Sequence, residues 1–164
     1  ETLKGLLKYK LNGHSSNGTI HYKTISKNLK VYFLYDKIDE KSATALISTL
    51  KLDDQDLLLP KFRGDFYQLR NHHIDCLKEA DMVVVYIEHV NPIWLQMKFL
   101  EILKSPGMGR EKKWLNQIIY LNTRQKIEWL EGNKEKMTVL ENDIKELANK
   151  IELGRKMLNH EANL

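Results

Sequence analysis

The spacing of apolar and polar residues between positions 29 and 121 predicts alternating strands and helices. Four short apolar runs have the length of β-strands: 29–35, 56–60, 82–87 and 117–121. Between them, apolar residues recur at helical spacing in three segments: 40–52, 66–80 and 92–104. The run 82–87 (M-V-V-V-Y-I) is apolar on both faces, which is typical of a parallel strand covered by helices on both sides. We therefore expect an α/β fold of the flavodoxin-like, three-layer kind with a central parallel sheet.

Polar residues mark where the predicted helices begin. Asp39 or Ser42 is suited to cap the first helix, and Asp65 the second, because their side-chain oxygens can accept hydrogen bonds from free backbone N–H groups. Asn91 caps the third, with Pro92 at the first position, where a missing N–H costs little. This third helix is more apolar than a surface helix needs, so it is either deeply buried or partly covered by a partner.

After residue 122 the pattern becomes that of a helical extension. Apolar residues fall at heptad spacing, with one interruption at Gly154: Met137, Leu140, Ile144, Leu147, Ile151 and Leu158. This stripe fits either a helix packed on its own domain or a coiled-coil contact between copies, and no fifth strand is evident. We divide the chain into a lead-in arm or linker (1–28), the α/β domain (29–122) and a C-terminal helix or helical hairpin (123–164).

Composition narrows the class of protein. The chain has 164 residues and a net charge of +4, but residues 1–35 hold six lysines against one acid. Because the basic excess lies in the arm and not on a face of the domain, we expect no nucleic-acid partner. No apolar run is long enough to cross a membrane. The single Cys76 fits a reducing cytoplasm, and the start without Met favours a piece of a longer protein.

Few residues carry recognisable chemistry. Asp36 and Asp39 follow the first strand and are expected to form a solvated, helix-capping loop. Arg63, with Gly64 and Asp65, forms a turn before the second helix, where its charge could help the helix N-terminus receive an anion. The adjacent histidines at 72 and 73 point about 100° apart on a helix, so we expect no metal site. Cys76 has no activating neighbour, so it is not expected to be a catalytic thiol.

The order of these features resembles the TIR-like (Toll/interleukin-1 receptor-like) domains of bacterial signalling and conflict proteins, which often accompany STAND nucleotide-switch modules. The matching segments are V-Y-F-L-Y-D at 31–36, L-L-L-P at 57–60, G-D at 64–65, L-R-N-H-H at 69–73, L-K-E-A-D at 77–81, V-V-V-Y-I at 83–87, N-P-I-W-L at 91–95, P-G-M-G-R at 106–110 and I-I-Y-L at 118–121. The resemblance covers about 90 residues. It implies a flavodoxin-like fold and a role in signalling or defence.

One branch of TIR domains hydrolyses NAD with a glutamate on the third helix, usually four residues after a tryptophan. Here Trp94 plus four is Lys98, and a cation there would repel the positively charged nicotinamide ribosyl centre. The nearest carboxylates are Glu101, one helical turn further, and Glu88, at the end of the third strand; both are weak catalytic candidates.

Our main hypothesis from the sequence is therefore a non-enzymatic TIR-like interaction domain that needs no cofactor. Its partner is expected to be a protein, most simply a second copy bound through the third or C-terminal helix. The expected interaction residues are Arg63, Asp65, Trp94, Lys98 and Arg110. Two alternatives stay open: a divergent enzyme that hydrolyses NAD, and a sensor that binds a nucleotide-type ligand at the carboxyl ends of the strands.

Overall fold

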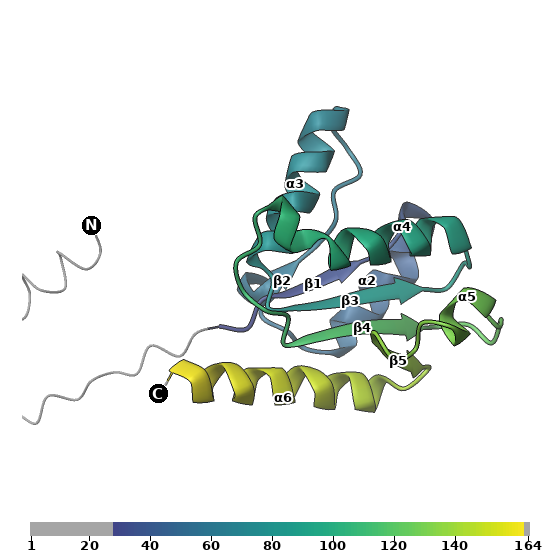
Figure 1. The fold of residues 1–164 in the computed structure, drawn as a ribbon. Coiled ribbons are helices and arrows are strands. Elements are labelled where there is room, and N and C mark those ends of the chain that lie inside the picture. Colours follow the sequence, from purple (N-terminus) through teal and green to yellow (C-terminus); the bar gives the residue numbers. More distant parts are fainter. Residues whose placement is uncertain (1–27, 163–164) are drawn as a thin grey trace, which may run out of the picture.

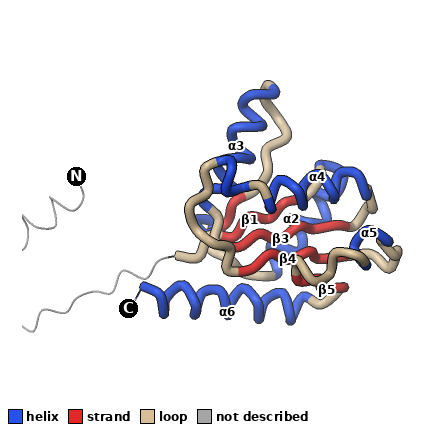
Figure 2. The backbone as a smooth tube through the Cα atoms, viewed as in Figure 1, coloured by secondary structure: helices blue, strands red, loops and turns tan. Residues whose placement is uncertain are grey.

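The computed structural model describes residues 28–162, so the expected arm lies almost wholly outside the described residues. Its centre is an all-parallel sheet of five strands in the order β2-β1-β3-β4-β5 (Figures 1 and 2). The strands are β1 (Val31–Leu34), β2 (Leu57–Leu58), β3 (Met82–Ile87), β4 (Asn116–Leu121) and β5 (Thr138–Glu141). Val31 pairs with both Leu57 and Met82, so β1 lies between β2 and β3. This is the flavodoxin-like order, and the predicted fold class is confirmed.

Helices cover both faces of this sheet. They are α2 (Glu40–Thr49), α3 (Phe66–Glu79), α4 (Pro92–Leu103), α5 (Glu128–Glu131) and α6 (Ile144–Ala162). Helices α3, α4 and α5 pack on one face, against strand residues such as Tyr32 and Val83. Helices α2 and α6 pack on the other, against Phe33 and Val84. All six residues of β3 are buried, as expected for a strand shielded on both sides.

The predicted boundaries of strands and helices hold to within a few residues, but one strand was missed. We expected no fifth strand, whereas Thr138–Glu141 forms β5 and pairs in parallel with β4. The heptad pattern hid it, because Met137 and Leu140 belong to the strand region and not to one long helix. Helix α6 confirms the C-terminal helical extension. Leu147 and Ile151 are buried against the same chain's sheet, so α6 packs within its own domain.

The loop after β1 differs from the expectation. Asp39 was predicted to lie in a solvated loop and was a candidate cap for the first helix, but its side chain makes no capping hydrogen bond to α2 and the residue is 2% exposed. Its carboxylate instead accepts hydrogen bonds from the loop that follows β3. Asp65 and Asn91 do cap α3 and α4 as predicted.

In the part of the chain that the structure describes, no helix combines the length and the hydropathy of a membrane span.

Candidate functional site

A pocket of about 410 Å³ lies where the end of β1 meets helices α3 and α4. Aromatic and apolar side chains form much of its wall: Tyr35, Phe62, Phe66, Leu69, Trp94 and Met97. Three cationic side chains also line it: Lys61, Arg70 and Lys98. Flat apolar surfaces beside separated cations suit a ligand that combines a planar ring with an anionic group.

A chain of hydrogen bonds joins four residues that line this pocket. The Tyr32 hydroxyl lies 2.9 Å from Nδ1 of His73, and Nε2 of His73 bonds to Oε2 of Glu101. Lys98 Nζ lies 3.2 Å from the same oxygen. Because a carboxylate only accepts, the consistent assignment has Nε2–H donating to Glu101 and the Tyr32 hydroxyl donating to Nδ1. His73 and Lys98 both contact Oε2, and within residues 28–162 the other oxygen of Glu101, Oε1, accepts no hydrogen bond.

Local sequence explains why these groups meet. Lys98 and Glu101 are three residues apart on α4, so they share one face of that helix. His73 lies on the side of α3 that also carries Leu69 and Leu77, and this side turns toward the sheet. Tyr32 points to the same face from β1. The three elements therefore converge from one side of the sheet.

The surroundings keep Glu101 ionised. Burial by itself would raise the pKa of its carboxyl, but the hydrogen bond from His73 and the charge of Lys98 outweigh burial, and the pKa is lowered overall. Burial raises the pKa of Tyr32 well above its usual range, so its hydroxyl keeps its proton and can donate. The result is a carboxylate with a fixed orientation and a negative charge at neutral pH.

The predicted catalytic candidates separate in the structure. Glu101 lies one helical turn beyond Lys98, and both side chains line the pocket. Glu88 does not line this pocket; it follows β3, and its backbone N–H donates to Asp39. The sequence indicates Glu101 as a candidate but not its link to His73, a residue for which the sequence predicts only the absence of a metal site.

The predicted interaction residues lie in different places in the structure. Trp94 and Lys98 line the pocket. Asp65 caps α3 in a reciprocal capping box with Gln68, so the start of that helix is already occupied, while Arg63 is exposed beside it. The prediction for Arg110 is wrong, because this residue is 4% exposed and donates to the backbone carbonyls of Leu77 and Ala80.

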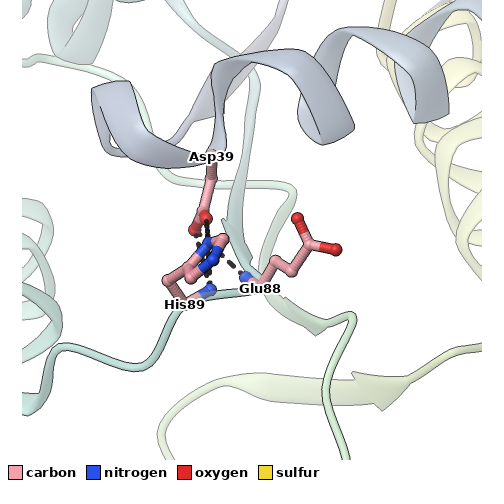
Figure 3. A group of neighbouring side chains, drawn as sticks. All are labelled: Asp39, Glu88 and His89. Atoms are coloured by element: carbon pink, nitrogen blue, oxygen red, sulfur yellow. Dashed lines mark hydrogen bonds and ion pairs between the residues drawn. The ribbon is translucent and has the colours of Figure 1, made fainter.

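A second group of polar side chains lies at the carboxyl ends of β1 and β3 (Figure 3). Asp39 accepts hydrogen bonds from the backbone N–H groups of Glu88 and His89, each at 3.1 Å, and from Nδ1 of His89 at 2.6 Å. One possible ligand atom from each of Asp39, Glu88 and His89 lies within 4.8 Å of the other two. Among the residues that the structure describes, this is the group close enough together to hold a metal ion. The sequence did not indicate this grouping because Asp39 and His89 are 50 positions apart.

The remaining nucleophile is poorly suited to catalysis. Cys76 is 3% exposed, and burial raises the pKa of its thiol to about 11, with smaller contributions from Glu79 and Asp75. A thiol of this kind carries very little thiolate at neutral pH. The expectation that Cys76 has no activating neighbour is wrong, because its Sγ lies 3.5 Å from Nε2 of His72. That nitrogen donates to the Leu59 carbonyl at 2.7 Å, so it carries a proton and cannot take one from the thiol.

The comparisons with known proteins give one result on fold. No protein-family model and no curated protein matches the chain. Among solved structures, the chain is similar to the CMP N-glycosidase BcmB of Clostridium botulinum, with 20% sequence identity and a TM-score of 0.44. The similarity covers 76% of this chain and 99% of that chain. The TIR-like kinship therefore stays a prediction.

The expected non-enzymatic interaction domain is corrected by these findings. One solved structure to which the chain is similar is described as a CMP N-glycosidase. The expectation had rested on Lys98 taking the place of a catalytic carboxylate, which would leave the pocket without one. In the structure Lys98 does not replace the carboxylate: it pairs with Glu101, and both side chains lie in the pocket.

Proposed function

We propose that the chain hydrolyses the N-glycosidic bond of a nucleotide-type substrate in the pocket between α3 and α4. One observation carries the proposal: an ionised carboxylate, Glu101, is held by His73 and Lys98 in a pocket lined by aromatic rings and cations. Cleavage of such bonds builds positive charge on the ribose ring, as glycoside hydrolysis does, and a fixed carboxylate beside that ring stabilises it.

The reaction assigns each group one task. The bond between C1′ and the base nitrogen breaks, and its electron pair leaves with the base. A water oxygen then bonds to C1′ and releases one proton. Oε1 of Glu101, which accepts no hydrogen bond from residues 28–162, stabilises the positive C1′, while His73 and Lys98 keep Oε2 in place. Tyr32 acts as a positioning residue, because its hydroxyl fixes the ring of His73.

The charge of the base decides whether a proton donor is needed. In a pyridinium N-glycoside such as NAD the base leaves neutral, and the proton from water goes to solvent. In a pyrimidine nucleotide such as CMP the departing base takes up one proton, which Lys98 or solvent supplies. The chain's similarity to a CMP N-glycosidase and its resemblance to TIR-like domains make CMP and NAD the first two compounds to test.

The experiment is incubation of the protein with NAD, CMP and other nucleotides, followed by chromatography for free base. We expect base release from at least one compound. Glu101→Gln keeps the shape of the side chain and removes its charge, and we expect it to lower kcat by at least about 100-fold. Glu88→Gln is the matched control, since Glu88 lies outside the pocket, and its rate should stay within twofold.

Two outcomes would reject the proposal. The first is no base release from any compound at high protein concentration. The second is equal loss of rate in both variants, because Glu101 would then have no special role. Nucleotide binding without cleavage, measured by calorimetry, would favour the alternative of a nucleotide sensor.

A further inference from the structure

A second cavity of about 460 Å³ adjoins the Glu101 pocket at the ends of β1 and β2. Six residues line it: Lys37, Glu40, Pro60, Lys61, Phe62 and Arg63. Three of them, Pro60, Lys61 and Phe62, line the Glu101 pocket as well. The two spaces therefore share a wall, and Lys61 stands at the boundary between them.

The second cavity is strongly cationic. Its charged residues are Lys37, Lys61 and Arg63 against the single acid Glu40, all four of them exposed. Among residues 28–162 none of the three cations forms a salt bridge. Three like charges on two neighbouring loops repel one another, and an anion between them relieves that repulsion. Arg63 adds a planar fork that fits two oxygens of a phosphate.

The division of cations between the two cavities indicates the length of the anion. The Glu101 pocket has its own cations, Lys61, Arg70 and Lys98, beside the acids Asp36 and Glu101, so a single phosphate on a nucleoside bound there needs no cation from the second cavity. Lys37 and Arg63 line only the second cavity, so they contact a group that extends past Lys61. A diphosphate has that extension and carries the additional negative charge.

We propose that this cavity is a subsite for the outer phosphate of a nucleotide with a diphosphate group. The proposal rests on the proposed function for the placement of base and ribose in the Glu101 pocket. The substrate class is then a nucleoside diphosphate or a dinucleotide, and a nucleoside or a nucleoside monophosphate leaves Lys37 and Arg63 without a partner. Glu40 lowers the affinity of the subsite by its negative charge.

The test is calorimetric binding of matched pairs, AMP with ADP and CMP with CDP, to the Glu101→Gln chain, which prevents turnover during the titration. We expect the diphosphate of at least one pair to bind at least 10-fold more tightly than its monophosphate. Lys37→Met combined with Arg63→Met should abolish this preference and leave monophosphate binding within twofold. Glu40→Gln should increase the preference. Lys145→Met, which removes an exposed lysine on α6, is the matched control and should change neither value.

Equal binding of monophosphate and diphosphate would overturn the subsite, as would a preference that survives the double substitution. Binding of NAD to the same variants distinguishes a nucleoside diphosphate from a dinucleotide as the ligand. If the diphosphate of NAD lies in this cavity, the double variant should bind NAD more weakly than the Glu101→Gln chain does. If it does not, the affinity for NAD should be unchanged. Failure of the subsite and failure of the proposed hydrolase activity give different results. A diphosphate preference that depends on Lys37 and Arg63 without base release by the unsubstituted chain supports the subsite and rejects the hydrolase. Base release without a preference for the diphosphate supports the hydrolase and rejects the subsite.

Discussion

Gly154 offers a quantitative test of how α6 packs on the sheet. It breaks the heptad stripe of the C-terminal segment, and it is buried where α6 passes Met82, the first residue of β3. A Cβ added at this position would lie 2.5 Å from Sδ of Met82 and 3.5 Å from Cδ2 of Leu29. Both neighbours are almost fully buried. The glycine is therefore explained by close approach of the helix backbone to β3.

Two opposing effects set the size of the change in Gly154→Ala. Alanine stabilises a helix interior by about 1 kcal/mol relative to glycine. Inserting a methyl group into a filled core typically costs about 1–3 kcal/mol, and the contact at 2.5 Å requires the thioether of Met82 to move. We expect the second effect to be larger, with a net loss of about 1 kcal/mol in the free energy of unfolding.

A double-mutant cycle identifies the cause. Met82→Val removes the sulfur atom that the new methyl group would meet, so in that background Gly154→Ala should be stabilising by about 1 kcal/mol. The expected coupling between the two sites is then about 2 kcal/mol, within the range found for residues in contact. Urea unfolding followed by circular dichroism measures all four variants. Asn149→Ala, at an exposed position of the same helix, is the control and should gain about 0.5 kcal/mol in both backgrounds. If Gly154→Ala is stabilising to the same extent in both backgrounds, α6 does not lie against Met82, and close packing on β3 does not explain the glycine.

Three further predictions concern single side chains. The hydrogen bond to Asp39 raises the pKa of His89. The stabilisation from this pair is therefore complete below the unfolded pKa of histidine, about 6.5, and is lost as the pH rises through the pKa of His89 in the folded chain. NMR titration should show a lower His89 pKa in Asp39→Asn, and an unchanged pKa would contradict the pairing. Replacing Arg110 with Met leaves two buried carbonyls without their donor and should cost about 2–5 kcal/mol in urea unfolding, whereas a loss below 0.5 kcal/mol would mean that the guanidinium is not buried there. Cys76, with its pKa raised to about 11 by burial, should react with iodoacetamide at pH 8 at least about 100-fold more slowly in the folded than in the unfolded chain, and similar rates would show that the thiol is accessible.

The sequence by itself determined the layers of the fold. The doubly apolar run at 82–87 required cover on both sides, and the helical spacing in 66–80 and 92–104 supplied helices to provide it. These features depend on the period of apolar residues within a short segment, and that period follows from the geometry of one strand or one helix. The same local logic identified Asp65 and Asn91 as helix caps, because a cap and the N–H that it bonds lie within three residues.

Only the tertiary structure decided which distant residues meet. Tyr32, His73 and Glu101 come from three elements and are separated by 41 and 28 positions, so no local period relates them. The same holds for β5: Leu140 in the strand and Met137 just before it fit a helical heptad as well as a strand, and pairing with β4 selected the strand. The proposed chemistry depends on such long-range contacts, because His73 on another helix, together with Lys98, keeps Glu101 ionised and holds one of its oxygens. A linear pattern contains the carboxylate but not the partners that make it a site.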